Sequence, residues 1–248
     1  MASATGIPQR IPDADTGAAE TEPLLGRAGD AAQKQGAPLI SNLWLGTGWI
    51  AQAGALLLLA VVWAGVFLNP LLPLVSPHPL LQSLGVFTIT QAILILQPTR
   101  TAEGKLVGAR AHAALNLVSF LLLASGIAVI ETNKGTDRAA HFHSPHAYLG
   151  VVTGALLLLQ YLFGFLIWAV PAVLGGDAAA RSLWRYHRWS GYAVYLLLLA
   201  TVATATRTPY SENVLGIKLW SVLVASALVV VGVFPRISVT KLGLRRSQ

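Results

Sequence analysis

Between Lys34 and Arg100 the sequence contains no lysine, arginine, aspartate or glutamate. A water-facing helix or a half-exposed sheet does not tolerate so long an uncharged stretch, because its outer face needs polar groups. The whole chain of 248 residues has the same character, since 54% of it is hydrophobic and only 11% is charged. The sequence therefore predicts an integral membrane protein and excludes a water-soluble globular enzyme.

Six apolar stretches follow a polar N-terminal segment, and each is close to the roughly 20 residues that cross a bilayer as a helix. The stretches lie at about 43–69, 78–97, 112–130, 146–170, 188–206 and 218–235. They are continuously apolar and show no alternation of period two, which excludes a β-barrel. We expect an all-α, multi-pass membrane protein with six transmembrane helices.

The charges outside these stretches predict the orientation of the chain. If the six spans alternate in direction, thirteen of the seventeen lysines and arginines fall on one side of the membrane and four on the other. The positive-inside rule then places both termini in the cytosol. We expect a disordered cytosolic tail at 1–40, a transmembrane domain at 41–236 and a basic cytosolic tail at 237–248. The net charge of +7 thus reflects topology and does not indicate a nucleic-acid partner.

Four of the six histidines fall at the N-terminal ends of successive inner spans: His78, His112, His146 and His187. Their spacings of 34, 34 and 41 residues each correspond to one crossing and one loop. Consecutive spans run antiparallel, so His78 and His146 share the outer face, and His112 and His187 share the cytosolic face. One pair in each leaflet, on helices that can be neighbours, is the arrangement that two bis-histidine haems need.

Residue composition and neighbouring glycines bear on the same interpretation. The chain has no cysteine and its one methionine is Met1, so a buried metal must use histidine or oxygen ligands. Gly85, Gly150, Gly154 and Gly191 lie on the faces of their histidines. These glycines either leave room for a flat macrocycle or allow close helix packing. A single histidine near a helix end is also often an interfacial residue without a ligand.

Spacing distinguishes between kinds of haem membrane protein. Respiratory cytochrome b subunits and ferric reductases of the NADPH oxidase type place two histidines, 13 or 14 residues apart, on each of two helices. In this chain no histidine stands at those distances after the four. The residues found there are Gln91 and Ala92, Ser125 and Gly126, Leu159 and Gln160, and Ala200 and Thr201.

One histidine on each of four consecutive helices resembles the cytochrome b561 family. The motifs that carry the resemblance, all within residues 43–235, are Ser76-Pro77-His78-Pro79-Leu80-Leu81, Gly108-Ala109-Arg110-Ala111-His112, Ser144-Pro145-His146-Ala147-Tyr148-Leu149-Gly150, Gln160-Tyr161-Leu162-Phe163-Gly164 and Tyr186-His187-Arg188-Trp189-Ser190-Gly191-Tyr192. The resemblance implies a homodimeric transmembrane electron carrier whose second to fifth spans bind two haem b groups. It also implies a cytosolic donor such as ascorbate, and monodehydroascorbate or ferric iron as acceptor.

Two departures from the family pattern concern the substrates. The second span ends in Ala92-Ile93-Leu94-Ile95-Leu96-Gln97, where members of the ascorbate type have an aromatic residue and an arginine. The outer motif reads Ser-Pro-His-Ala-Tyr instead of Ser-Leu-His-Ser-Trp. The chain is therefore most similar to the family's shorter, domain-containing branch. We expect it in the membrane of an endomembrane vesicle, a vacuole or a lysosome, or in the plasma membrane.

Five further residues are candidates for substrate contacts. Arg100, Lys105 and Arg110 lie between the second and third spans beside one acid, Glu103, and would attract an anionic donor, although the positive-inside bias alone also explains them. His141 and His143 precede His146 on the outer side and would dock a ferric chelate, although a solvated His-x-His sequence in a loop more often binds nothing.

Two alternative functions account for parts of the sequence. A metal transporter would use the three imidazoles of the His141-Phe142-His143-Ser144-Pro145-His146 segment, but the spans contain no interior acid to carry ions or protons. A non-catalytic membrane scaffold leaves the four-histidine pattern unexplained. We therefore expect a transmembrane oxidoreductase without further catalytic side chains.

Overall fold

The computed structural model describes residues 31–34, 36–136, 141–238 and 242, and within these residues all regular structure is helical. The long helices are α1 (Gly48–Phe67), α2 (Pro77–Leu96), α3 (Ala102–Lys134), α4 (Pro145–Ala169), α5 (Asp177–Ala205) and α6 (Leu219–Val233). Short helical turns are η1 (Leu39–Leu43), η3 (Pro171–Leu174), η4 (Ser211–Leu215) and η5 (Phe234–Arg236). The predicted all-α membrane bundle is confirmed.

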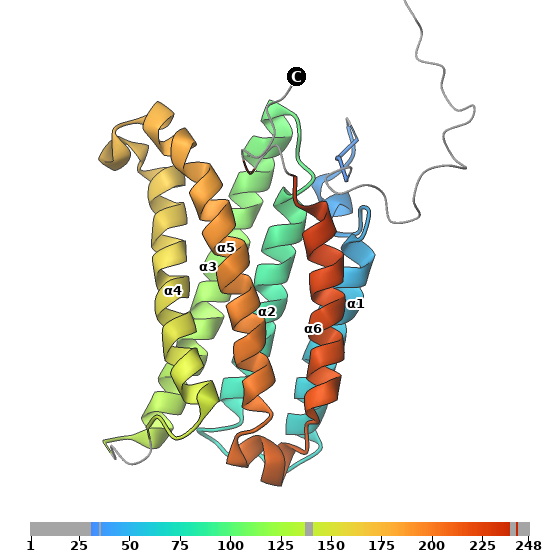
Figure 1. The fold of residues 1–248 in the computed structure, drawn as a ribbon, viewed down its shortest axis with the longest axis vertical. Coiled ribbons are helices and arrows are strands. Elements are labelled where there is room, and N and C mark those ends of the chain that lie inside the picture. Colours follow the sequence, from blue (N-terminus) through green and yellow to red (C-terminus); the bar gives the residue numbers. More distant parts are fainter. Residues whose placement is uncertain (1–30, 35, 137–140, 239–241, 243–248) are drawn as a thin grey trace, which may run out of the picture.

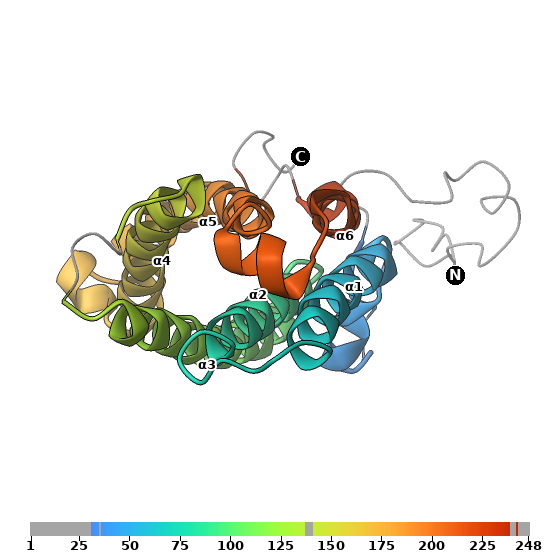
Figure 2. The same ribbon diagram turned by 90° about the horizontal axis from the view of Figure 1, so that it is seen from below.

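The helices run alternately up and down (Figure 1). Seen along the bundle, α2, α3, α4 and α5 form a ring, with α1 and α6 outside it (Figure 2). The closest packing is between α2 and α3, between α4 and α5, and between α1 and α6, and α1 also packs on α2. Contact between α3 and α4 is sparse by comparison. The ring therefore consists of two tight antiparallel pairs that face each other.

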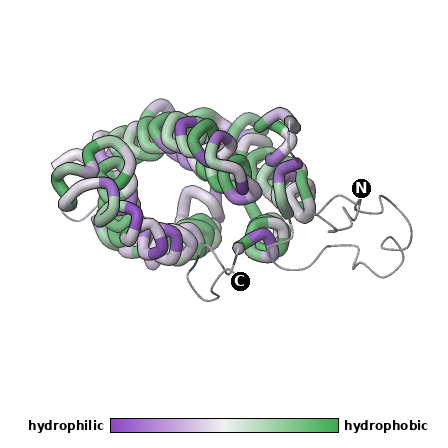
Figure 3. Tube along the Cα trace, turned by 90° about the horizontal axis from the view of Figure 1, so that it is seen from above, coloured by the Kyte–Doolittle hydropathy of each residue, from purple (hydrophilic) through white to green (hydrophobic). Residues whose placement is uncertain are grey.

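In the part of the chain that the structure describes, five helices are long and apolar enough to cross a membrane by length and composition: α1, α2, α3, α4 and the segment from α6 to η5. The apolar character covers most of the bundle (Figure 3). The sixth long helix, α5, is less apolar because its first turns carry Arg181, Arg185 and Arg188. It lies beside α4 along the bundle (Figure 1), where the six-span prediction places the span that contains 188–206.

Two helices begin about ten residues before the predicted spans. α3 begins at Ala102 and α5 at Asp177, where the sequence predicts starts near 112 and 188. The first turns of α3 are stabilised by a cap, since the Thr101 side chain accepts a hydrogen bond from the Gly104 amide. The prediction was wrong here because apolar length marks the membrane-crossing part of a helix and not its polar extension.

The two described ends of the chain meet at the same end of the bundle (Figure 1), as six crossings require. Arg236 is buried, and its Nη2 donates to the carbonyl oxygens of Asn42 and Leu94. The guanidinium thus satisfies a carbonyl in the last turn of α2, where a cation is favoured. α1 and α6 are in backbone contact, because a Cβ on Gly232 would lie 2.2 Å from the Ala51 amide nitrogen.

Most of the two predicted tails, 1–40 and 237–248, lies outside the described residues. In the described part, the backbone N–H of Gln33 donates to the carbonyl oxygen of Pro98 at 3.0 Å. The Gln33 side chain also accepts a hydrogen bond from Asn42. The segment that leads into η1 therefore lies against the connection between α2 and α3.

Candidate functional site

The four histidines meet as two pairs at different levels of the ring. His78 is the second residue of α2 and His146 the second residue of α4, and their ring centroids are 6.2 Å apart with an interplanar angle of 75°. His112 on α3 and His187 on α5 are close enough to interact electrostatically. The structure thus brings together the pairs that the alternation of the spans predicts, one from each side of the ring.

Each of these histidines is fixed by a hydrogen bond from the adjacent helix of its own tight pair. The bond always involves the ring nitrogen Nδ1. The partner atoms are the carbonyl oxygen of Gly126 for His78 at 2.9 Å, that of Ala92 for His112 at 2.7 Å, that of Thr201 for His146 at 2.9 Å, and the side-chain Nε2 of Gln160 for His187 at 3.0 Å. In all four histidines this leaves the second ring nitrogen, Nε2, available to bind a ligand.

These partners follow one rule of register. Ala92 stands fourteen residues after His78 on α2, and Gly126 fourteen residues after His112 on α3. The same interval separates Gln160 from His146 on α4, and Thr201 from His187 on α5. Each helix therefore supplies one histidine at one level and the partner of its neighbour's histidine at the other. Fourteen residues of α-helix span about 21 Å, which is the axial separation of the two levels.

His187 has a more elaborate setting than the other three. Its ring lies against Gly164 on α4, where a Cβ would be 2.7 Å from the ring Cε1. The Phe163 ring packs edge-on, with 6.0 Å between the centroids. Gly191 leaves room for the Gln160 amide, since a Cβ there would lie 2.8 Å from Nε2. The motif from Gln160 to Gly164 thus holds this ring, a role that the sequence did not reveal.

Two sequence interpretations need correction. His112 and His187 do not lie at the N-terminal ends of their helices, because each is the eleventh residue of a helix that extends beyond the predicted span. Two glycines are also explained without a macrocycle. Gly191 accommodates Gln160, and Gly85 allows close packing of α2 on α3, because a Cβ there would lie 2.6 Å from Leu123.

The remaining glycines differ from these two. A Cβ on Gly150 would meet no atom within 4 Å, and one on Gly154 would make an ordinary contact of 3.5 Å with Ile127. The part of α4 that carries these two glycines therefore leaves space beside His78 and His146.

The three candidate cations for the donor are exposed at the end of the bundle nearer His112 and His187. Arg100 lies in the connection after α2, whereas Lys105 and Arg110 lie on α3 itself. Arg110 precedes His112 by two residues. The cations thus extend from the connection along the first turns of the helix that carries His112.

The two outer candidates have different surroundings. His141 Nδ1 lies 3.2 Å from the Glu131 carboxylate, which also accepts a hydrogen bond of 2.7 Å from Lys134. His143 is exposed. Among the described residues, no group of three or more histidine, cysteine, aspartate or glutamate side chains is placed to hold a metal ion.

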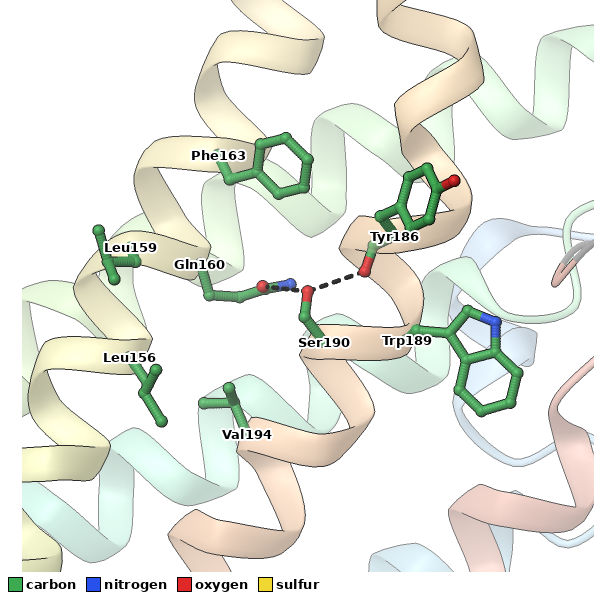
Figure 4. A pocket seen from close by; sticks show the side chains of 8 residues that line it. All are labelled: Leu156, Leu159, Gln160, Phe163, Tyr186, Trp189, Ser190 and Val194. Atoms are coloured by element: carbon green, nitrogen blue, oxygen red, sulfur yellow. Dashed lines mark hydrogen bonds between the residues drawn. The ribbon is translucent and has the colours of Figure 1, made fainter.

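A groove of about 580 Å³ lies between α4 and α5 beside the His187 setting. Its lining is mainly apolar and aromatic, with Gln160 and Ser190 as the polar groups. Figure 4 shows the Ser190 hydroxyl bonded to the Gln160 side chain and to the Tyr186 carbonyl oxygen.

Comparison with known proteins agrees with this arrangement. The sequence model of the eukaryotic cytochrome b561 family matches residues 77–210, which include α2 to α5 and all four paired histidines. A human protein named lysosomal membrane ascorbate-dependent ferrireductase is 30% identical over 144 residues, covering 56% of this chain and 58% of the relative. A sheep protein named transmembrane ascorbate-dependent reductase is 29% identical over 173 residues, covering 64% and 67%. The matches thus span about half to two thirds of these curated relatives.

Proposed function

The chain belongs to the cytochrome b561 family, and we propose on that premise that it is a transmembrane oxidoreductase that carries electrons through two haem b groups. His78 and His146 would hold one haem, and His112 and His187 the other. This pairing rests on the two levels at which the ring brings the histidines together.

The observation that carries the proposal is the geometry of the histidine pairs. With each metal–nitrogen bond at about 2 Å, two imidazoles on one iron place their ring centroids about 6 Å apart, and His78 and His146 are 6.2 Å apart. Three of the four Nδ1 atoms face a backbone carbonyl oxygen. A carbonyl fixes the proton on Nδ1 and leaves the Nε2 lone pair for iron. The residues present therefore fit the group.

The positions of the two histidine pairs would define the path of electrons across the membrane. Bound haem would supply a one-electron carrier at each level. The two levels are about 21 Å apart along the helices, while a hydrocarbon core is about 30 Å thick. A small-molecule donor and acceptor would therefore need to approach only the outer ends of the bundle, and apolar helices would keep water from the interior between the levels.

The substrates follow from the relatives and from the exposed charges. Relatives are named for ascorbate-dependent reduction, so ascorbate is the proposed cytosolic donor, guided by Arg100, Lys105 and Arg110. The proposed acceptor on the other side is a ferric chelate or monodehydroascorbate, near His141 and His143. A lysosomal or other endomembrane location and a homodimeric state complete the proposal.

An absorption spectrum of the purified protein tests the central claim. We expect about two haems per chain, a b-type spectrum with bis-histidine ligation, and reduction on addition of ascorbate. A colourless protein that remains folded would contradict the proposal and favour a scaffold. Haem that ascorbate leaves oxidised would retain the carrier function and overturn the donor. Light scattering in detergent distinguishes a dimer from a monomer.

A further inference from the structure

We propose that Gln160 is the positioning residue of His187 and that its side-chain oxygen takes the part played by a backbone carbonyl at the other three histidines. The inference rests on the proposed function, because it concerns how His187 is prepared as a ligand. It starts from the register described above, in which Gln160 occupies the position on α4 that corresponds to Ala92, Gly126 and Thr201.

The side-chain amide of Gln160 contacts three groups on α5. Its Nε2 lies 3.0 Å from His187 Nδ1 and 2.7 Å from the His187 carbonyl oxygen, and its Oε1 accepts a hydrogen bond of 2.8 Å from the Ser190 hydroxyl. An amide nitrogen donates and never accepts. In this orientation Nδ1 must therefore accept, and the ring proton is then on Nε2, the atom that would bind iron.

The two ends of a glutamine amide have nearly the same shape, so their assignment depends on the hydrogen bonds they make. Turning the amide by 180° puts Oε1 at Nδ1, where it accepts the Nδ1 proton as the three carbonyl oxygens do. The amide N–H then donates to the Ser190 oxygen, and the Ser190 hydroxyl donates to the Tyr186 carbonyl oxygen, 2.8 Å away. The reversed amide gives up the bond from Nε2 to the His187 carbonyl oxygen, 2.7 Å away. Oε1 must therefore move away from that oxygen, which keeps the i to i+4 bond of its helix, as it accepts from Nδ1.

Two glycines leave space for the side chains of Gln160 and His187 where they meet. Gly191 leaves space for the amide, since a Cβ would come within 2.8 Å of it, and Gly164 leaves space for the ring at 2.7 Å. Figure 4 shows Gln160 reaching from α4 toward Ser190 on α5. Two close approaches and a bonded serine at one side chain indicate a specific role, because simple helix packing would not need the amide.

The use of the Gln160 side chain as the partner of His187 Nδ1 also affects the reduction potential of the haem. A stronger acceptor at Nδ1 makes the imidazole more electron-rich, which stabilises ferric iron and lowers the reduction potential. Gln160 therefore tunes one haem of the two through a group that mutation can change, whereas the acceptors at the other three histidines belong to the backbone.

The experiment uses the purified full-length protein, with redox titration and haem quantification. The haem that His187→Ala removes identifies the site. We expect Gln160→Leu to lower the haem content of that site or to shift its midpoint potential upward. Gln160→Glu, which keeps an acceptor, should retain the haem and shift the potential downward. Gln82→Leu is the matched control, because the Gln82 amide donates only to the Leu123 carbonyl oxygen on the other side of the ring, and it should leave this haem unchanged.

Three outcomes would overturn the assignment. An unchanged haem content and potential in Gln160→Leu would show that His187 needs no acceptor from Gln160. Loss of the haem from both Gln160 variants would indicate a packing role. A wild-type protein without haem would overturn the proposed function and this assignment together, whereas the first two results, obtained on a red wild-type protein, overturn the assignment alone.

Discussion

The ring nitrogen Nδ1 of His78 lies 2.9 Å from the carbonyl oxygen of Gly126, and this contact is repeated in reverse a few turns away, where His112 Nδ1 lies 2.7 Å from the carbonyl oxygen of Ala92. The antiparallel helices α2 and α3 thus each provide one histidine and one carbonyl oxygen to the other. α4 and α5 make the corresponding contacts in the same register through Thr201 and Gln160.

The pairing of the histidines predicts which variants share a defect. We expect His78→Ala and His146→Ala to remove the same spectral component, and His112→Ala and His187→Ala to remove the other, because each iron needs both axial imidazoles. Low-temperature spectra and haem quantification measure this. His143→Ala is the control and should retain both haems. If His78→Ala and His146→Ala abolish different signals, the pairing is wrong.

Gly164→Ala should disturb the site that contains His187. The added methyl group would lie 2.7 Å from the ring Cε1, so the ring must move from the position that Gln160 and α5 define. We expect a lower haem content at that site, measured by the pyridine haemochrome method. Val152→Ala is the control, since it shortens an exposed side chain on the same helix. Equal haem contents in the two variants would contradict the expectation.

Charge reversal at Lys105 tests the donor site. Lys105 is exposed on the first turns of α3, and replacing its positive charge by a negative one would repel an ascorbate anion. We expect Lys105→Glu to raise the half-saturating ascorbate concentration by about fivefold at low salt, with less effect at high salt and an unchanged haem spectrum. Lys218→Glu, at the opposite end of the bundle, is the control. Identical kinetics in the two variants would leave Lys105 with a role in topology only.

The outer histidines are tested by reoxidation of the reduced protein. We expect the double change His141→Ala, His143→Ala to slow electron transfer to a ferric chelate while both haems remain bound. Stopped-flow absorbance measures the rate. Glu131→Gln removes the carboxylate that holds His141 at 3.2 Å and separates the effect of its placement from that of the imidazole. Wild-type rates in the double variant would exclude this docking site.

Arg236 is expected to matter for stability and not for haem binding. Its Nη2 lies 2.6 Å from the Asn42 carbonyl oxygen and 3.0 Å from that of Leu94. Arg236→Met would leave these buried oxygens without their donor, which costs about 2–3 kcal/mol. Thermal unfolding in detergent should show a lower midpoint. Arg207→Met is the control, because Arg207 is exposed and its ion pair with Glu212 is 3.7 Å long, so less than about 1 kcal/mol is expected. Equal midpoints would contradict this.

The sequence was sufficient for the architecture and for the placement of the histidines. Continuous apolar length predicts the six helices, and the alternation of antiparallel spans predicts that His78 meets His146 and His112 meets His187. Neither inference needs side-chain detail. Apolar length does not predict the polar first turns of α3 and α5, although Thr101 before the α3 sequence is a signal for the start of a helix.

The hydrogen-bond partners of the histidines could not be predicted in the same way. Ala92, Gly126, Gln160 and Thr201 stand fourteen residues after the four histidines, and in the sequence they are notable only because none of them is a second histidine. Backbone carbonyls belong to every residue, so three of the four partners leave no mark in the sequence. Only Gln160 acts through its side chain, and a glutamine inside an apolar span is the signal that could have been followed.

The reciprocal register makes the distance between the two sites a property of the helical rise. Each helix of the ring carries a histidine at one level and the hydrogen-bond partner of its neighbour's histidine at the other, so an α2 that slid along α3 would break both contacts together. The connecting loops do not enter this relation. Insertions and deletions in the loops can therefore accumulate without altering the distance between the two histidine levels, whereas a single residue inserted between His112 and Gly126 would turn one level by about 100° relative to the other.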